Sequence, residues 1–404
     1  MIYFDNAASA PLCEEAKAAL IRETEAFANP SSLHRLGYEA ELRLKEARAA
    51  VARSLGAQPE EIFFTSGGTE ADNWAILAAA RKMKKAGNHI LTTDSEHPAV
   101  AEPLKKLEEE GFAVTRLSTR GGALDPAEAA AAVSEKTVLV ACMHTNNETG
   151  ARYDLAAVIR LAKAKNPRCL AFSDGVQGYL KSDFVPAALG LDLMSVSAHK
   201  IGGPKGVGAL WIRRGVSLPP LILGGGQERN LRSGTENLPG IVAFGAAAAA
   251  RSASLKEDLA RMGAVRETVL AGLSGVAGIR FNLPRDPSCH VLSLQVDGWR
   301  SEALLHALSE KDVFVSSGSA CSSHKGRGPV LTNFGLTKDE ADRTLRLSFA
   351  PGNTAAEAEA FCRAVARQMR RRACRYFLGR GSISRDKARK KRRKHKQNDS
   401  GAFA

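Results

Sequence analysis

The chain has few cysteines, and they lie far apart. Its 404 residues include seven cysteines, an odd number, and no two of them form a Cys-x-x-Cys pair. Disulfide scaffolds need paired cysteines, and structural zinc sites need cysteines or histidines at short, regular spacings. The sequence therefore predicts neither a disulfide framework nor a metal site.

Long apolar runs and a basic N-terminal segment are also missing. No stretch approaches the roughly 20 consecutive apolar residues that cross a bilayer. The N-terminus, Met1 to Asp5, brings an early acid and no positive charge, unlike a secretory signal. A content of 44% hydrophobic and 25% charged residues is typical of soluble globular proteins. We therefore expect a cytoplasmic protein without membrane contact.

Positive charge is concentrated at the C-terminal end. The segment from Arg367 onward contains 15 Lys and Arg residues but only two acidic residues, Asp386 and Asp399. It therefore carries almost all of the net charge of +14. Such composition predicts a disordered basic tail over residues 371–404. Non-specific RNA contact through residues 370–396 would rest on phosphate neutralisation. A solvated tail is the alternative, because no aromatic residue for base stacking is interleaved with the basic residues after Phe377.

Apolar, strand-like runs alternate with helical patterns through much of the chain. Examples of such runs are His89–Thr93, Thr137–Cys142 and Cys169–Phe172. This alternation predicts a largely parallel sheet that is covered by helices on both faces. The length is sufficient for one large and one smaller domain. We expect an Ala-rich helix from about Gly240 to Leu273 to lead into the smaller one.

One lysine stands just after a strand-like run. The apolar run Leu191–Ser195 leads into Ser197-Ala198-His199-Lys200 and then into a loop rich in glycine and proline. A lysine amine that lies against apolar residues and near other cations has a lowered pKa. The neutral amine can then form a Schiff base with an aldehyde such as pyridoxal phosphate (PLP). An exposed loop lysine is the alternative for this motif alone.

A carboxylate precedes this lysine in the sequence. Asp174 follows a strand-like run, at the end where open α/β sheets place ligand groups. An Asp there can pair with a protonated pyridine nitrogen and so make PLP an electron sink. A turn or cap residue is the alternative. Asp174-x-x-Gln177 followed by Ser197-x-His199-Lys200 is a specific combination, and in it the chain resembles the class V, fold-type-I PLP enzymes, in particular the cysteine desulfurases of the IscS/NifS-like branch.

The resemblance covers about residues 1–370 and implies a fold of two domains. It implies a large PLP-binding domain over residues 12–255, with a mostly parallel sheet covered by helices. It also implies a smaller α+β domain, built from residues 1–11 and 256–370, that carries the catalytic loop. The resembled enzymes are homodimers in which a segment like that around Thr235 reaches the phosphate of the neighbouring subunit.

A glycine-containing turn is the predicted phosphate site. Ser66-Gly67-Gly68-Thr69 lies between a strand-like run and a helical pattern. Glycines there let backbone N–H groups approach a phosphate, and the helix dipole adds to the attraction. We therefore assign Gly68 and Thr69 to the phosphate, with a simple helix cap as the alternative. The resemblance implies further cofactor contacts by His97, Asn147, Asp174, Gln177, Ser197, His199 and Lys200.

A cysteine lies in a segment of small polar residues. Cys321 ends the motif Ser316-Ser317-Gly318-Ser319-Ala320-Cys321, and basic residues that follow it would favour the reactive thiolate. So many serines and glycines argue against a cysteine packed in a core. The motif matches the catalytic loop of the resembled family, which implies that Cys321 is a nucleophile on a mobile loop.

Two further positions concern the substrate. The resemblance places Asn29 and Asn147 at the substrate site, and a residue of an Asn-Pro turn is the alternative for Asn29. It also implies that Arg346 holds the substrate carboxylate in a two-point ion pair that lysine does not reproduce. A structural salt bridge is the alternative for Arg346.

The resemblance implies PLP-dependent removal of sulfur from L-cysteine, which gives L-alanine and a persulfide on Cys321. Lys200 and His97 would move the α-carbon proton. The sulfur would pass to an acceptor or scaffold protein, for iron–sulfur cluster assembly or tRNA thiolation. A selenocysteine lyase would retain these residues and stays an alternative. A class V aminotransferase would have no use for Cys321, and a primarily RNA-binding protein would depend on the tail.

Overall fold

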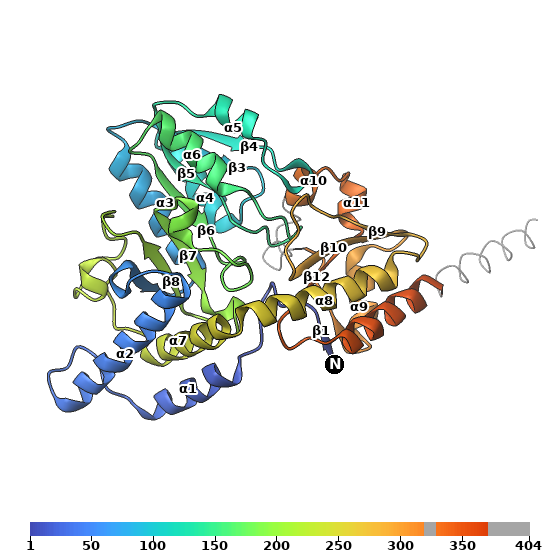
Figure 1. The fold of residues 1–404 in the computed structure, drawn as a ribbon, viewed down its shortest axis with the longest axis horizontal. Helices are drawn as coiled ribbons and strands as arrows, with labels where there is room; N and C mark the ends of the chain where they lie inside the picture. The colour runs from blue at the N-terminus through green and yellow to red at the C-terminus, as the bar shows by residue number, and fades with distance from the viewer. Residues whose placement is uncertain (319–328, 371–404) are drawn as a thin grey trace, which may run out of the picture.

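The fold is given by a computed structural model, which describes residues 1–318 and 329–370. Figure 1 shows a larger α/β part and a smaller part, with the successive helices α7 (Leu238–Ala253) and α8 (Leu255–Leu273) leading from one to the other. Cys321 and the basic tail lie outside the described residues.

The larger part contains a sheet of seven strands. Their order is β2 (Ile62–Thr65), β8 (Gly208–Ile212), β7 (Leu193–Ser197), β6 (Leu170–Asp174), β5 (Thr137–Ala141), β3 (His89–Thr93) and β4 (Ala113–Leu117). Strand β8 is antiparallel to both of its neighbours, and all other neighbouring pairs are parallel. Every residue of β5, β7 and β8 is buried, which explains their largely apolar sequences. The predicted α/β fold with a largely parallel sheet is confirmed.

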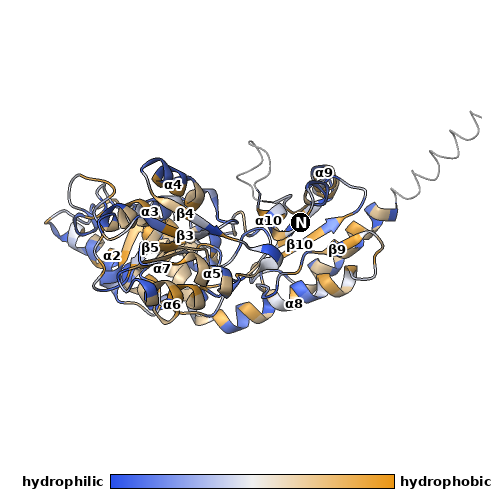
Figure 2. Ribbon diagram, turned by 90° about the horizontal axis from the view of Figure 1, so that it is seen from above, coloured by the Kyte–Doolittle hydropathy of each residue, from blue (hydrophilic) through white to orange (hydrophobic). Residues whose placement is uncertain are grey.

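Helices cover both faces of this sheet. Side chains alternate across a strand, so Leu139 and Ala141 join one hydrophobic core, whereas Val140 joins the other. The first core contains α3 (Gly68–Met83) and α4 (Pro98–Glu109), and the second contains α1 (Glu14–Glu25), α2 (Arg35–Ser54), α5 (Pro126–Ala132), α6 (Leu155–Lys165) and α7 (Leu238–Ala253). Figure 2 shows the hydrophobic colouring concentrated in the central strands.

The smaller part has its own sheets and core. Strands β12 (Thr344–Ser348), β10 (Val291–Val296) and β9 (Ile279–Phe281) form an antiparallel sheet, and β1 (Ile2–Tyr3) pairs in parallel with β11 (Val313–Phe314). The N-terminal segment also contacts β12, because Asp5 forms an isolated parallel β-bridge with Ser348. Its helices are α8 (Leu255–Leu273), α9 (Ser301–Ser309), α10 (Val330–Phe334), α11 (Lys338–Asp342) and a helical stretch over 355–370.

Short 3-10 helices connect several of these elements. They are η1 (Pro59–Glu61), η2 (Arg120–Gly122), η3 (Pro186–Leu189), η4 (Ala198–Lys200) and η5 (Glu228–Asn230).

The single helix predicted from Gly240 to Leu273 is wrong, because two helices bent by 78° occupy this stretch. The Ser254 hydroxyl donates to the Ala250 carbonyl at 3.1 Å and to the buried Asp258 carboxylate at 2.9 Å. A serine that bonds the backbone in this way competes with helix continuation. No single helix within the described residues is long and apolar enough to span a membrane; α7 and α8 pass that test only as a bent pair.

A strained turn packs against the outer strand β2. Glu228, Arg229 and Asn230 have φ values of 46°, 59° and 66°, a left-handed conformation that costs roughly 1–2 kcal/mol per residue outside glycine. The Glu228 carboxylate accepts two hydrogen bonds from Arg48 at 2.7 Å and one from the Phe64 N–H at 2.9 Å. These contacts hold the turn in place.

Replacing Arg48 with methionine is expected to lower the free energy of unfolding by about 3–5 kcal/mol, because the buried Glu228 carboxylate, with a side chain only 3% exposed, loses its cationic partner. Urea unfolding measures the change. The matched control is Arg35→Met, which breaks the exposed pair with Glu39 and should cost less than about 1 kcal/mol. Equal losses in the two variants would show that the Arg48 pair does not hold the turn.

Candidate active site

A cavity of about 200 Å³ lies beside the carboxyl ends of β6 and β7. Ligands of open α/β sheets bind at such strand ends. Ten residues predicted for the cofactor or the substrate line this cavity, namely Gly68, Thr69, His97, Asn147, Asp174, Gln177, Ser197, His199, Lys200 and Arg346. Segments that are far apart in the sequence therefore meet at one place.

Lys200 ends the short helix η4, directly after β7. Its Nζ donates hydrogen bonds to the carbonyl oxygens of Ala7 and Ala8, at 2.8 and 2.9 Å. Both alanines belong to the N-terminal turn and also line the cavity. The amine is thus held at the cavity wall.

Asp174 is the last residue of β6 and is 7% exposed. One carboxylate oxygen accepts a hydrogen bond from the Val176 N–H at 2.9 Å. Burial raises the pKa of Asp174, and the charges of His97 and Lys200 oppose this rise. A protonated ring nitrogen in the cavity would further favour the carboxylate form.

Two of the predicted lining side chains each keep one buried polar atom without a hydrogen-bond partner in the described part of the chain. Gln177 donates through Nε2 to the Ala7 carbonyl at 2.9 Å, but its Oε1 has no partner. Arg346, 2% exposed on β12, donates to Asp5 at 2.8 Å and to the Asn147 carbonyl at 3.0 Å, but its Nε has none. Buried polar atoms of this kind are normally satisfied, here by a ligand or by water. The salt bridge considered for Arg346 is therefore present, and the guanidinium also reaches the cavity.

Two histidines are fixed by hydrogen bonds at the cavity. His97 caps α4, and its Nδ1 accepts from the Ala99 N–H at 3.1 Å, so the neutral ring carries its proton on Nε2. His199 Nδ1 lies 3.3 Å from the Ser9 hydroxyl. Burial, with a contribution from Lys200, lowers the pKa of His199 to about 4, so this ring is neutral at neutral pH.

The N-terminus of α3 forms the anion-binding end. Helix α3 begins at Gly68, and the first backbone N–H groups of a helix have no partner within the helix. A Cβ atom at position 68 would lie 2.6 Å from Cγ2 of Val176, so the close contact between the start of α3 and Val176 requires glycine. This cradle fits the phosphate of PLP, the amine fits its aldehyde, and the carboxylate fits its protonated ring nitrogen. The unpartnered Gln177 oxygen can accept a hydrogen bond from its phenolic hydroxyl.

Two predicted residues that the structure describes do not line the cavity. Asn29 is exposed, and its Oδ1 accepts from the Ser31 N–H at 2.8 Å within its own turn. Thr235 is exposed in the loop that precedes α7. Cys321 lies outside the described residues. Their roles stay predictions.

The sequence analysis missed two buried carboxyl groups. Asp72 lines the cavity one helical turn after Thr69, is 1% exposed, and has an Oδ1 without a partner in the described chain. Burial and the nearby Asp174 raise the pKa of Asp72 well above its ordinary value. Glu96 accepts from the Thr93 hydroxyl at 2.7 Å and the Met143 N–H at 2.9 Å. The i, i+3 spacing of Asp72 from Thr69 is a signal that could have identified it.

Glu96 makes the stability of the protein depend on pH. Burial raises its pKa to about 8, so between the unfolded value near 4.5 and pH 8 the folded state keeps a proton that the unfolded chain has lost. The contribution of Glu96 is fully present below that window, and within it the free energy of unfolding should fall by about 1.4 kcal/mol per pH unit. Glu96→Gln should remove this component, as measured by urea unfolding across the window. The exposed Glu102→Gln is the control, and an unchanged slope in Glu96→Gln would contradict the assignment.

Comparison with known proteins agrees with this geometry. The profile of the family Aminotransferase class-V matches residues 2–361. The chain is 36% identical over 362 residues to a protein named cysteine desulfurase IscS from Methanosarcina thermophila, covering 89% of each chain. It is 38% identical over 365 residues to a protein of the same name from Shewanella sediminis (strain HAW-EB3), covering 88% of this chain and 89% of that one. A solved structure titled NifS-like protein has a TM-score of 0.86 and 36% identity, with 91% of this chain and 99% of that chain covered.

Proposed function

Since this chain belongs to the class-V aminotransferase family, we propose that it is a PLP-dependent cysteine desulfurase. The observation that carries the proposal is the convergence of Lys200, Asp174 and the Gly68–Thr69 turn on one cavity. The names of its relatives and the cysteine at position 321 support the same chemistry. The proposed substrate is L-cysteine, and the products are L-alanine and a persulfide on Cys321.

The residues of the cavity have separate roles in this proposal. PLP, when bound, supplies an electron sink for the α-carbon of the substrate. Lys200 holds the cofactor and then accepts the α-carbon proton, and His97 Nε2 is the second proton carrier. Asp174 keeps the proton on the ring nitrogen. Arg346 binds the substrate carboxylate through its unpartnered Nε.

The sulfur transfer step uses Cys321. Its thiolate attacks the sulfur atom of the substrate, a sulfur–sulfur bond forms, and the bond between substrate sulfur and Cβ breaks. The electron pair of that bond stays on the carbon skeleton, which takes up a proton and leaves as alanine. The persulfide then passes its outer sulfur to an acceptor protein. We further propose a homodimer, in which the exposed Thr235 of one subunit contacts the phosphate bound by the other.

The test is a product assay on the purified full-length protein with PLP. A cysteine desulfurase releases alanine and, with a thiol reductant, sulfide in equal amounts from L-cysteine. Faster turnover of selenocysteine by more than tenfold would identify a selenocysteine lyase instead. Transfer of the amino group to a 2-oxo acid without sulfide would identify an aminotransferase.

A further inference from the structure

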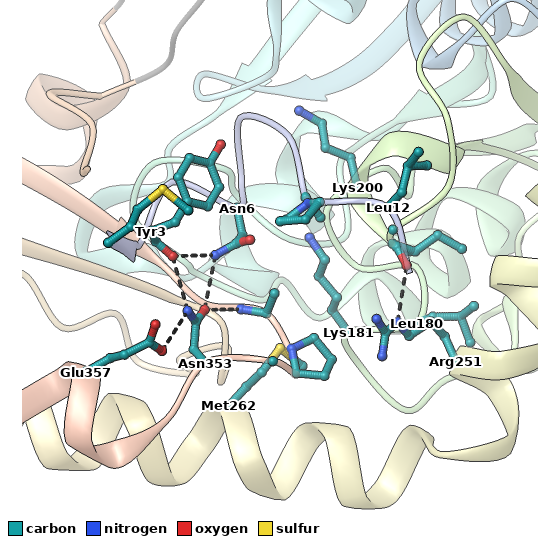
Figure 3. A pocket seen from close by; sticks show the side chains of 18 residues that line it. Tyr3, Asn6, Leu12, Leu180, Lys181, Lys200, Arg251, Met262, Asn353 and Glu357 are labelled. Carbon is teal, nitrogen blue, oxygen red and sulfur yellow. Dashed lines mark hydrogen bonds between the residues drawn. The ribbon is translucent and has the colours of Figure 1, made fainter. Parts of the chain in front are cut away.

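A second cavity, of about 290 Å³, lies next to Lys200 on the side of the N-terminal strand and α8 (Figure 3). It is lined by residues of the N-terminal segment, the loop after β6, the ends of η4 and α7, helix α8, and the segment 350–353. Of the residues that the structure describes, Lys200 alone lines both this cavity and the cofactor cavity. The proposed function does not use this second cavity.

Lys181 places a buried amine in the wall of this cavity. Its side chain is 5% exposed, and its Nζ has no hydrogen-bond partner among the residues that the structure describes. Figure 3 shows this side chain extending among the lining residues, with its nitrogen toward the side of Asn6 and Lys200. Leu180, which precedes it, has a φ of 52°, so a strained backbone places the amine here.

Two other charged side chains of the lining, Arg251 and Glu357, already have partners. Arg251 donates to the Ile201 carbonyl and to Asp258, both at 3.3 Å. The Glu357 carboxylate accepts from the Asn353 side chain at 3.2 Å and from the Thr354 N–H at 2.9 Å. A buried charge without a partner is costly. Lys181 is therefore the group for which an anion in this cavity would supply the missing contact.

The positive charges near Lys181 also favour an anion beside its amine. Burial, together with the cations Lys200, Arg346 and Arg251, lowers its pKa to about 7, whereas Cys289 opposes this shift. An anion next to the amine would reverse part of this shift, because it favours the charged form.

The walls define the class of anion. The apolar lining residues include Leu12, Leu180, Ile201, Met262 and Pro351. The nearby amide of Asn6 already donates to the carbonyls of Tyr3 and Ser348 and to the Asn353 side chain. One unpartnered amine in an apolar enclosure suits a single negative charge, whereas a phosphate needs several donors. We propose that this cavity binds a small monocarboxylate, whose oxygens accept hydrogen bonds from Lys181 Nζ.

The test compares sodium acetate with its neutral isostere acetamide, at constant ionic strength, by thermal unfolding of the full-length protein with PLP. Acetate should raise the melting temperature by about 2 °C at ten times its dissociation constant, and acetamide should not. Lys181→Met should remove the shift. The exposed Lys256→Met on α8 is the matched control and should retain it.

Arg346→Gln separates this site from the substrate site, because acetate could also bind Arg346. Retention of the shift in Arg346→Gln supports the Lys181 site, and its loss there overturns the proposal. Equal shifts with acetate and acetamide, no shift with either, or a full shift in Lys181→Met also overturn it. If the methionine variant does not fold, Lys181→Gln provides the same comparison. None of these outcomes depends on desulfurase activity, so the two proposals fail separately.

Discussion

Replacing Lys200 with alanine is expected to lower sulfide formation from L-cysteine by about 10⁴-fold, because the variant loses both the amine that holds the cofactor and the base that accepts the α-carbon proton. The visible absorbance of the covalently attached cofactor should disappear as well. Alanine and sulfide assays measure the first effect, and absorbance after gel filtration measures the second.

Lys205 provides the matched control for this experiment. It is an exposed lysine five residues further along the same loop, so Lys205→Ala should retain cofactor and activity. The Lys200 variant also loses the hydrogen bonds to the Ala7 and Ala8 carbonyls, and a melting temperature for both variants separates lost chemistry from lost folding. A folded Lys200→Ala protein that retains covalent PLP would contradict the assignment.

Cys321→Ser should reduce sulfide formation by at least about 10³-fold while leaving the cofactor absorbance unchanged, because the hydroxyl is a far weaker nucleophile than a thiolate and residue 321 is not among the proposed cofactor contacts. The spectrum of the variant with L-cysteine should still change, since substrate binding does not require the thiol. Mass spectrometry of the wild-type protein should show one added sulfur atom on Cys321.

Cys289→Ser is the control for Cys321→Ser. The Cys289 thiol is partly buried and contacts the Lys181 carbonyl at 3.7 Å, outside the cofactor cavity. Its replacement should leave sulfide formation within about twofold of wild type, as for a side chain without a catalytic role. If Cys289→Ser and not Cys321→Ser abolished activity, the nucleophile would have been assigned to the wrong residue.

The features that the sequence predicted well are local ones. Lys200 and Asp174 each follow an apolar run, and a parallel sheet brings the carboxyl ends of such strands to one edge. Their meeting in one cavity could therefore be anticipated from neighbouring residues alone. The buried runs of β5 and β7 predicted the sheet for the same reason.

The features that the sequence did not predict depend on distant contacts. The break between α7 and α8 involves Ser254 and a buried Asp258 that also pairs with Arg251 and Arg261, and no helix propensity marks it. The bond between Arg346 and Asp5 joins residues 341 positions apart. Lys181 was also missed, because a single lysine in a sequence gives no sign that its amine will be buried.

The contact between the N-terminal segment and strand β12 has a consequence for the order of folding. Ser348 donates its backbone N–H to the Phe4 carbonyl at 2.7 Å, and its hydroxyl accepts from the Ala7 N–H at 2.8 Å. The turn that holds the amine of Lys200 therefore rests on a strand that is translated more than 140 residues after that lysine. During synthesis the first residues must wait for this strand to leave the ribosome, so the catalytic pocket is completed as one of the last events of maturation.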